Sequence, residues 1–377
     1  MHGSALVVGG GIAGLAVARG LLAAGWAVEV REREAGPPDS GTALGMWPQA
    51  MAALARVGVA DAVRARSVHE PGGALLRPDG RPLARVGAGA RLISRPALHE
   101  VLLDGMPSGT VVWGAGVTAP ADLRDPDVDV VVGADGIRSA VRGHAFPGAP
   151  APRPLGTVAF RGTLPGLSPG ALPGTADAVT ETWGRGRLFG ITPQHPDAVN
   201  WFACVRRELL AGAPPDEGPA ALLGRLYRGW HPAVAAVVGR LDDRRVDRRE
   251  LLEVPRLPSY VAGRNVLVGD AAHAMAPNLG RGACEALLDA AALVEALVAG
   301  GTVADGLRRY DRARRGPSRR VAHGSRLMNR VSTATTAAPA RDRLLSLVSR
   351  VAAPAVAAGG RGERGRGERS PAGRDAA

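Results

Sequence analysis

Residues 5–34 read ALVVGGGIAGLAVARGLLAAGWAVEVRERE, and this stretch decides the fold. Its first four residues form an uninterrupted apolar run, which is typical of a central strand in a parallel sheet that is buried on both faces. Gly9, Gly11 and Gly14 follow directly and match the pattern GxGxxG. The first glycine of that pattern permits a tight turn, the second lets the backbone approach a pyrophosphate, and the third lets a helix pack closely on the strand.

The residues after the glycines complete a strand–helix–strand unit. An Ala- and Leu-rich stretch predicts a helix that ends at Gly25, and its N-terminus would present free amides to a phosphate. A second strand over residues 26–31 then leads to Glu32, whose carboxylate can accept both hydroxyls of a ribose. The other interpretation of Glu32 is a solvated charge at a strand end. Because an acid disfavours a phosphate on that ribose, the unit predicts FAD or NAD rather than NADP.

Two further stretches join a short apolar strand to a glycine and an aspartate. Residues 128–142 read VDVVVGADGIRSAVR and contain Asp135. Residues 265–289 read NVLVGDAAHAMAPNLGRGACEALLD, in which Asp270 follows the strand and a Gly-rich turn opens a long helix. An aspartate at the carboxyl end of a strand can bind a polyol hydroxyl. The start of the helix aims backbone amides at developing negative charge.

Together these three stretches resemble the fingerprints of the FAD-dependent aromatic monooxygenases of the para-hydroxybenzoate hydroxylase fold, and within them the salicylate-hydroxylase-like branch. Residues 43–63 (ALGMWPQAMAALARVGVADAV), 92–103 (LISRPALHEVLL) and 183–193 (WGRGRLFGITP) resemble the family as well. The likeness runs from about residue 4 to about residue 350. It implies an α/β fold with a Rossmann-like FAD-binding domain, a mixed or antiparallel β-sheet substrate domain, and C-terminal helices.

The resemblance and the changes of pattern along the chain predict four parts. The FAD-binding domain is expected to be discontinuous, over residues 1–68, 92–156 and 253–304. The substrate domain is expected over residues 69–91 and 157–252, where TVAFRGTL, GRLFGITP and AVNWFACVR alternate like antiparallel strands. Residues 305–350 are expected to form C-terminal helices. The low-complexity residues 351–377 are expected to be a disordered tail.

The resemblance also implies which residues bind FAD: Gly9, Gly11, Ala13, Gly14, Glu32, Arg33, Arg95, Val117, Asp135, Asp270, Gly280, Gly282 and Ala283. The glycine loop would hold the pyrophosphate, and the residues at the end of the second strand would hold the adenosine. Arg95 would reach the phosphates or the ribityl chain, and Asp270 would bind the ribityl hydroxyls. Asp135 with Arg142 would serve FAD and the nicotinamide cofactor. The backbone of residues 277–283 would stabilise the anionic pyrimidine end of the reduced flavin.

The residues expected to shape the substrate pocket are Gly45, Met46, Trp47, Pro277 and Trp201. No catalytic side chain is assigned, because the flavin carries the difficult chemistry in such enzymes. His273 is interpreted as a packing or capping histidine rather than a general base. Arg281 stands where most relatives carry glutamine, and it would place a permanent positive charge near the flavin. No metal site is expected, since Cys204 and Cys284 lack the spacing of metal ligands.

The activity implied by the resemblance is that of an FAD-dependent, NAD(P)H-consuming monooxygenase. It would hydroxylate or epoxidise an electron-rich aromatic or polyketide-like small molecule through a flavin hydroperoxide. The sequence contains one dinucleotide-binding loop, so NADH or NADPH would bind transiently as a cosubstrate, with dioxygen as the other. One alternative is a flavin-dependent reductase of a prenyl or other apolar small molecule. An alternative of a different class is an anionic-surface binding protein that uses a basic C-terminus.

The charge of the chain is concentrated at its C-terminal end. The 377 residues hold 47 arginines and no lysine against 35 acids, a net charge of +12. Residues 1–304 hold 30 arginines and 29 acids, whereas residues 305–377 hold 17 and 6. This distribution gives no argument for an anionic substrate or a nucleic-acid-binding core, and any weak contact with an anionic surface is expected through the C-terminal region. Two cysteines and the lack of an export signal or a membrane-length apolar run predict a cytoplasmic protein without an integral membrane segment.

Overall fold

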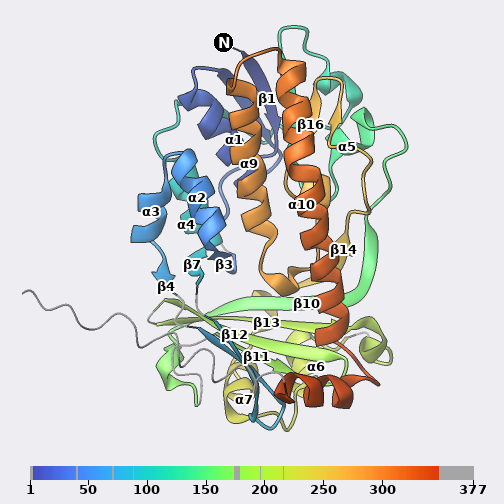
Figure 1. Ribbon diagram of the computed structural model, residues 1–377. Coiled ribbons are helices and arrows are strands. Elements are labelled where there is room, and N and C mark those ends of the chain that lie inside the picture. Colours follow the sequence, from blue (N-terminus) through green and yellow to red (C-terminus); the bar gives the residue numbers. More distant parts are fainter. Residues whose placement is uncertain are drawn as a thin grey trace, which may run out of the picture.

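The computed structural model describes residues 3–39, 41–69, 72–87, 89–173, 179–195, 197–214 and 216–347. The low-complexity segment predicted at residues 351–377 and the last three residues of the predicted C-terminal helices lie outside the described residues. Two large β-sheets lie one above the other in Figure 1, and a long helix runs beside both. Among the described helices, none is both long and apolar enough to cross a membrane.

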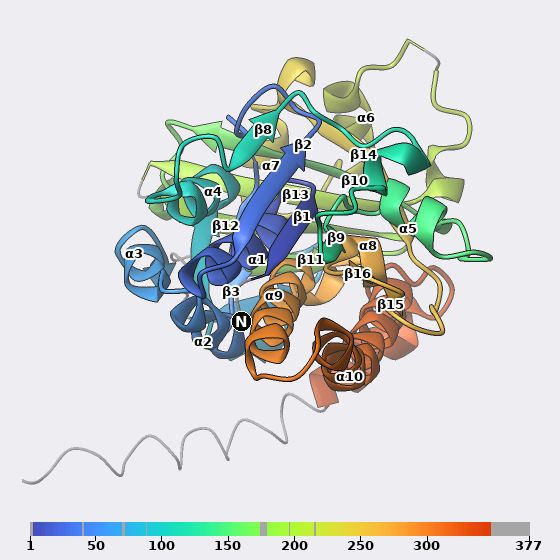
Figure 2. The same cartoon turned by 90° about the horizontal axis from the view of Figure 1, so that it is seen from above.

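The first sheet contains the strand–helix–strand unit of residues 5–34, in which α1 (Ile12–Ala23) connects β1 to β2. The order of its strands is β15 (Val261–Ala262), β16 (Asn265–Leu267), β9 (Val130–Gly133), β1 (Ser4–Val8), β2 (Ala27–Glu32) and β8 (Val111–Trp113). All neighbouring strands are parallel except the β15–β16 pair, which is antiparallel. The carboxyl ends of β2, β1, β9 and β16 therefore lie along one edge of the sheet (Figure 2).

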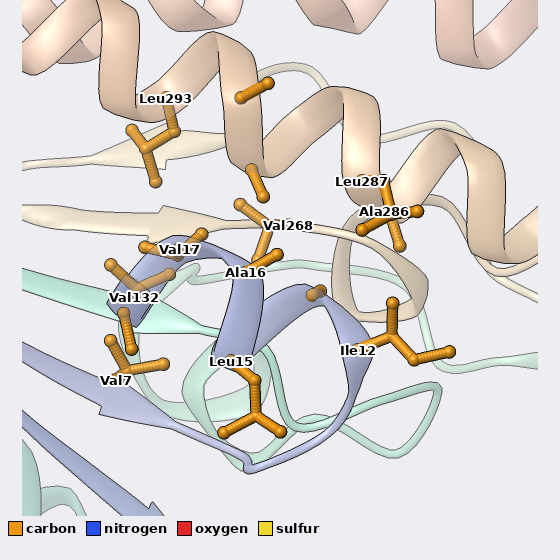
Figure 3. Packing of buried hydrophobic residues seen from close by; sticks show 14 of the residues in the cluster. Val7, Ile12, Leu15, Ala16, Val17, Val132, Val268, Ala286, Leu287 and Leu293 are labelled. Atoms are coloured by element: carbon orange, nitrogen blue, oxygen red, sulfur yellow. The ribbon is translucent and has the colours of Figure 1, made fainter. Parts of the chain in front are cut away.

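Helix α1 and helix α9 (Gly282–Val298) pack together on this sheet. Figure 3 shows Ala16 and Val17 of α1 among Val132 of β9 and Leu293 of α9, all of them buried. The two helices approach closely at Gly20, where a Cβ would lie 2.7 Å from a methyl group of Val294. Full burial of a side chain such as Val17 contributes about 1.5–3 kcal/mol to the stability of the fold, relative to leaving it exposed. A continuous apolar core therefore supports the glycine loop from behind.

The second sheet contains strands in the order β14 (Asp247–Glu253), β10 (Arg153–Pro165), β13 (Ala198–Arg206), β12 (Arg187–His195), β11 (Val179–Trp183), β5 (Gly73–Leu76) and β6 (Pro82–Val86). Its neighbours are antiparallel except β11 and β5, which are parallel. One face packs against α6 (Pro219–Leu226) and α7 (Pro232–Val238), which lie below the sheet in Figure 1. The alternation of side chains along each strand turns the other residues toward the first sheet.

Smaller elements connect the two sheets. A third sheet consists of β3 (Ala43–Met46), β7 (Arg91–Ser94) and β4 (Val68–His69). The short helices are α2 (Pro48–Arg56), α3 (Ala60–Ala65), α4 (Arg95–Leu103), α5 (Ala140–Ala145) and α8 (Asp270–His273). The 3-10 turns are η1 (Pro120–Leu123), η2 (Pro169–Ala171), η3 (Arg207–Leu210), η4 (Asp243–Arg245) and η5 (Pro277–Leu279).

Helix α10 (Val303–Ser332) joins the two large sheets into one body. The Tyr310 hydroxyl donates a hydrogen bond to the Leu267 carbonyl of the first sheet, at 2.8 Å. Near the other end of the helix, Asn329 Nδ2 donates to Thr157 Oγ1 of the second sheet, at 3.1 Å. A further helical segment over residues 338–347 follows α10. The long helix therefore holds both sheets in a common frame.

This architecture confirms the predicted α/β fold with a Rossmann-like domain, a mixed β-sheet domain and C-terminal helices. The first sheet takes its strands from residues 4–32, 111–133 and 261–267, and the second from residues 73–86 and 153–253. Strand β10 begins at Arg153, before the predicted boundary at residue 157, and α10 begins at Val303 rather than at residue 305. The domain boundaries themselves stay a prediction.

Candidate functional site

The glycine pattern after β1 forms a tight loop that leads into α1. Gly9 has a φ of +106°, and a Cβ there would lie 2.5 Å from the Ala134 carbonyl oxygen. A Cβ on Gly14 would lie 1.9 Å from the Gly9 carbonyl oxygen, so the fold itself requires these two glycines. A Cβ on Gly11 would meet nothing within 4 Å. Gly11 therefore leaves open space at the N-terminus of α1, where the helix dipole favours a phosphate.

Glu32 and His99 hold the glycine loop from two sides. Glu32 Oε2 accepts a hydrogen bond from Gly10 N (2.6 Å), and its Oε1 accepts one from Glu34 N (2.9 Å). Each carboxylate oxygen keeps a further lone pair that a ribose hydroxyl can use. His99 of α4 lies with Nε2 2.7 Å from the Gly10 carbonyl oxygen, and burial lowers its pKa, so the neutral ring donates from Nε2. His99 was not predictable from the sequence, because nothing in the sequence indicates that α4 packs on this loop.

The segment after β8 runs beside the end of β2. Ala115 N donates a hydrogen bond to the Glu32 carbonyl oxygen, at 2.8 Å. A Cβ on Gly116 would lie 2.9 Å from Arg33 Cβ, so the two segments touch at this glycine. Val117 follows directly. The residues predicted to hold the adenosine end, Glu32, Arg33 and Val117, are thus brought to the same end of the loop.

The second motif is used largely for internal contacts. Asp135 Oδ2 accepts hydrogen bonds from two backbone amides at the start of α5 (2.6 and 3.1 Å), while its Oδ1 is buried without a partner among the described residues. Arg142 is only 4% exposed and donates to the carbonyl oxygens of Ala271 (2.7 Å) and Ile137 (2.6 Å). This contradicts the expectation that Arg142 contacts a cofactor, because its guanidinium ties the second motif to the third. Asp135 keeps one free oxygen at the site.

The third motif places Asp270 next to Arg95. Gly269, with a φ of +57°, turns the chain from β16 into α8, of which Asp270 is the first residue. Asp270 is exposed to solvent, yet the protein packed around it raises its pKa, a combination expected of a carboxylate at the wall of a concave site. Burial also lowers the pKa of Arg95, an effect that Arg161 reinforces and Asp270 opposes. Arg95 forms no hydrogen bond or ion pair with a protein group in the described part of the chain.

The turn before α9 leaves its backbone open. A Cβ on Gly280 or on Gly282 would meet nothing within 4 Å, so a flat group can approach the start of this helix. Ala283 follows and is only partly buried. Arg281 lies between them with Nη2 3.0 Å from Glu285 Oε1 and Nη1 3.4 Å from Gln49 Oε1. The positive charge expected near the flavin is therefore balanced in part by the Glu285 carboxylate.

Glu285 belongs to a chain of buried charges behind the site. Arg314 of α10 donates to Glu285 Oε2 (2.6 Å) and Asp289 Oδ1 (2.7 Å), and His273 Nε2 lies 2.5 Å from Asp289 Oδ2. Asp289 Oδ2 also accepts a hydrogen bond from Gly269 N, at 2.8 Å. Burial opposes ionisation of Asp289, but His273 and Arg314 outweigh it and lower its pKa. His273 is thus bound to Asp289 inside the fold, and its interpretation as a packing rather than a catalytic histidine stays a prediction. Arg314 was missed because its contacts depend on how α10 packs on α9.

The pocket candidates from the first domain differ in their exposure. The Gly45 carbonyl oxygen accepts a hydrogen bond from Cys284 Sγ at 3.1 Å, which fixes β3 beside the start of α9. Trp47 is partly buried, and its Nε1 has no hydrogen-bond partner in the part of the chain that the structure describes; Pro277 is exposed. Met46 is fully buried in the core of this domain. Burial contradicts the expectation that the Met46 side chain lines the pocket.

Trp201 contradicts its expected position as well. It is 1% exposed and stacks on Phe189, with ring centroids 5.8 Å apart, on the face of the second sheet that α6 and α7 cover. Alternation along β13 turns Phe202 and Asn200 to the other face. On that face Asn200 Oδ1 accepts a hydrogen bond from Ala43 N of β3, at 3.3 Å. Sequence reasoning identified the correct strand but assigned the wrong face.

The cysteines are buried free thiols. Burial raises the pKa of Cys204 to about 12, so it stays protonated, and burial also raises the pKa of Cys284. Across the described residues, no group of three or more His, Cys, Asp and Glu side chains is arranged to hold a metal ion.

Comparison with known proteins agrees with this geometry. A family model described as an FAD binding domain matches residues 3–100 and 122–325. The aurachin C monooxygenase/isomerase of Stigmatella aurantiaca is 33% identical over 82% of this chain and 84% of its own length. The 2-heptyl-3-hydroxy-4(1H)-quinolone synthase of Pseudomonas aeruginosa is 32% identical over 76% of this chain and 78% of its own.

Solved structures share the fold. Klebsiella pneumoniae HpxO complexed with FAD and uric acid superimposes with a TM-score of 0.81 at 23% identity, covering 93% of this chain and 95% of that one. A salicylate hydroxylase substrate complex gives a TM-score of 0.74 at 22% identity, covering 94% and 95%. The chain therefore belongs to the FAD-dependent aromatic monooxygenases. It is an FAD-dependent enzyme of the aromatic hydroxylase type, for which NAD(P)H is the usual cosubstrate.

Proposed function

We propose that this enzyme binds FAD along the carboxyl edge of the first sheet, with the flavin ring directed toward the second sheet. One observation carries the proposal. Gly9, Glu32, Asp135 and Asp270 stand at or just after the ends of β1, β2, β9 and β16, four strands whose carboxyl ends share one edge. In open parallel sheets, ligands bind outside the carboxyl ends of the strands.

The residues at this edge fit FAD in shape and charge. The space at Gly11 admits a pyrophosphate to the N-terminus of α1, and Glu32 has lone pairs for the ribose. Asp135 offers a buried oxygen to which no described residue donates a hydrogen bond. Arg95, exposed to solvent and without a protein anion bonded to it among the described residues, suits the phosphates or the ribityl chain. Asp270 then lies beside Arg95, where ribityl hydroxyls can bind its carboxylate.

FAD, when bound, accepts a hydride from NADH or NADPH and activates dioxygen for the transfer of one oxygen atom. The protein residues supply binding, orientation and the exclusion of water. The open backbone at Gly280 and Gly282 directs the N-terminus of α9 toward the pyrimidine end of the ring, where it favours negative charge. Trp47 and Phe202 offer apolar surface on the two sides of the site.

The proposed substrate is an electron-rich aromatic or polyketide-like small molecule that is hydroxylated or epoxidised. The names of two relatives, a 4(1H)-quinolone synthase and a 6-hydroxynicotinate 3-monooxygenase, support screening nitrogen heteroaromatics first. The nicotinamide cosubstrate is proposed to bind transiently, because one dinucleotide-binding loop is present in the sequence. Measuring the oxidation of NADH and of NADPH in the presence of these substrates shows which cosubstrate the enzyme prefers.

The test is direct. The purified protein should be yellow, and a substrate should stimulate NAD(P)H oxidation that depends on dioxygen and yields a product heavier by one oxygen atom. Incorporation of ¹⁸O from labelled dioxygen distinguishes oxygen transfer from mere oxidase activity. A colourless protein that cannot be reconstituted with FAD would refute the proposal, and a product formed without dioxygen would favour the reductase instead.

We also propose a cytoplasmic location for the enzyme. The usual dependence of its family on NAD(P)H and the free thiols of Cys204 and Cys284 support it. Cell fractionation tests this location, since the enzyme should accompany cytoplasmic marker proteins.

A further inference from the structure

One carboxyl group on the second sheet faces the cofactor domain without an ion pair to any described residue. Strand register sets Arg161 of β10, Phe202 of β13, Gly190 of β12 and Glu181 of β11 in one row across the sheet. Glu181 Oε2 accepts a hydrogen bond from Trp183 Nε1, at 2.9 Å, so both side chains lie on the same face. Its other oxygen accepts no hydrogen bond from any residue that the structure describes, and none of those residues forms an ion pair with it.

Contacts of β13 and β10 identify this face as the one that meets the cofactor domain. On β13, Asn200 is two residues from Phe202 and accepts a hydrogen bond from Ala43 N of β3, at 3.3 Å. At the β10 end of the row, Arg161 is close enough to Arg95 that its charge adds to the effect of burial in lowering the pKa of Arg95. The opposite face is filled by the core formed with α6 and α7. Glu181 is therefore on the same surface as the expected flavin.

The surroundings of Glu181 are largely apolar. The Phe202 ring lies across Gly190, where a Cβ would be only 2.1 Å from the ring. On the other side of Glu181, its register partner on β5 is Leu75. Burial raises the pKa of Glu181, and the hydrogen bond from Trp183 opposes that rise only in part. An ionised carboxylate that is half-buried in apolar surroundings costs free energy unless hydrogen-bond donors or a cation compensate for the lost water.

The titratable and charged groups nearest to Glu181 on this face are Cys204, Arg341 beside its partner Trp183, and Arg161 at the β10 end of the row, which is paired with Asp247. Cys204 of β13 is a buried thiol whose pKa is raised to about 12, by burial and by the charge of Glu181. Arg341, from the helical segment after α10, lies with its guanidinium carbon 5.5 Å from the centroid of the Trp183 ring. Its donors are engaged by Asp342 and by backbone carbonyl oxygens, so it does not neutralise Glu181.

We propose that Glu181 Oε1 recognises the substrate by accepting a hydrogen bond from a ring N–H or phenolic O–H of an aromatic molecule that lies against Phe202. This inference rests on the proposed function and narrows its substrate class to aromatics that carry such a donor. No covalent bond is made or broken by Glu181. Aromatics whose polar group is a carboxylate are disfavoured, because two carboxylates would repel each other in this apolar site.

The experiment measures binding to the FAD-loaded enzyme through the change in flavin absorbance. The probes are two matched pairs, 4(1H)-quinolone with 1-methyl-4(1H)-quinolone, and 1-naphthol with 1-methoxynaphthalene. Methylation removes the donor and keeps the ring. In the wild type we expect methylation to weaken binding by about 10- to 100-fold in at least one pair, the effect of losing a hydrogen bond to a charged group. In Glu181→Leu the members of that pair should bind equally, whereas the control Glu208→Gln, an exposed acid of the same domain, should keep the preference.

The pH dependence separates recognition from a merely structural role. Binding of the preferred donor requires ionised Glu181, so affinity should fall as pH decreases through the raised pKa of this group. Trp183→Phe removes the donor that lowers this pKa, so the midpoint should move to higher pH. Glu181→Gln should abolish the midpoint while FAD remains bound.

Three results decide the matter. Equal binding of methylated and unmethylated probes by the wild type would overturn the role of Glu181. So would a preference, or a pH midpoint, that survives in Glu181→Leu. Failure of the proposed function is distinguishable, because a protein that takes up no FAD lacks the visible flavin absorbance before any probe is added.

Discussion

Replacing Arg314 by methionine would leave two buried carboxylates without their shared cation. Arg314 is 8% exposed, and Glu285 and Asp289 are 2% and 0% exposed. Methionine preserves most of the side-chain length and apolar volume but removes the donors to Glu285 Oε2 and Asp289 Oδ1. Breaking a buried ion pair by removing one partner costs about 3–5 kcal/mol of the free energy of unfolding. For a domain of this size, such a loss lowers Tm by roughly 6–20 °C.

The same substitution should weaken FAD binding. Asp289 accepts the hydrogen bond from Gly269 N at 2.8 Å and thereby orients the turn that carries Asp270. Loosening that turn removes about one hydrogen bond's net contribution, so we expect the Kd for FAD to rise about tenfold. Fluorescence of the released flavin measures the Kd, and thermal unfolding of the FAD-free protein measures the stability separately.

The control is Arg312→Met, an exposed arginine of the same helix, which should change the free energy of unfolding by less than about 0.5 kcal/mol. The sign of the pH effect gives a second check. In Arg314→Met, the carboxylate of Asp289 is left buried with less compensating charge, so its pKa in the folded state should rise. The loss of stability relative to the wild type should then be larger near pH 8 than near pH 5. Equal losses by both variants, or a loss independent of pH, would refute the assignment to buried charge.

The remaining predictions concern the glycine loop, His273 and the C-terminal region. Gly11→Ala should fold with an unchanged Tm but bind FAD at least about tenfold more weakly. Gly14→Ala should lose both stability and FAD binding, because of these two positions only Gly14 has backbone atoms where the new Cβ would lie. Thermal unfolding and FAD titration measure the two effects, and equal behaviour of the two variants would contradict the loop geometry. Burial disfavours protonated His273, but Asp289 outweighs burial and raises its pKa, so this pair stabilises the fold below about pH 6.5 and that stability is lost as pH rises through the raised value. The Tm of His273→Gln should therefore not show this pH-dependent decline. If the Tm of the variant and of the wild type change with pH in the same way, the His273–Asp289 pair is not the cause. Finally, vesicles containing anionic lipid should retain the full chain weakly and salt-sensitively, and retention that survives truncation after Leu347, which keeps α10, would exclude the arginines of residues 348–377 as the cause.

The parts of the fold that depend on local pattern were predictable. The apolar run of β1, the glycines after it and the acid at Glu32 occur within one short stretch, so their roles in turn, helix packing and strand end follow from local sterics. The same holds for Asp270, which directly follows a buried strand. Alternation also predicted β13 as a strand, since period-two patterns report extended structure.

Which side of each element meets the site was decided by tertiary packing. Trp201 and Phe202 are adjacent in β13, and only the placement of α6 and α7 determines that Trp201 is buried beneath the sheet while Phe202 faces the cofactor domain. Arg142 resembled a cofactor ligand by its motif. Its guanidinium instead donates hydrogen bonds to the carbonyl oxygens of Ile137 and Ala271, which are more than a hundred residues apart in the sequence.

The sequence by itself therefore determined the class of enzyme, the α/β fold and most residues expected to contact FAD, because glycine sterics and strand–helix order act over a few residues. Only the tertiary structure decided that His99 holds the glycine loop, that Arg314 balances the buried charges behind Asp270, and that Glu181 forms no ion pair with any residue that the structure describes. Hydrogen bonds and charges act over a few ångströms in space. Separation along the sequence does not indicate which residues become such neighbours, because the packing of α4, α10 and β11 brings them together.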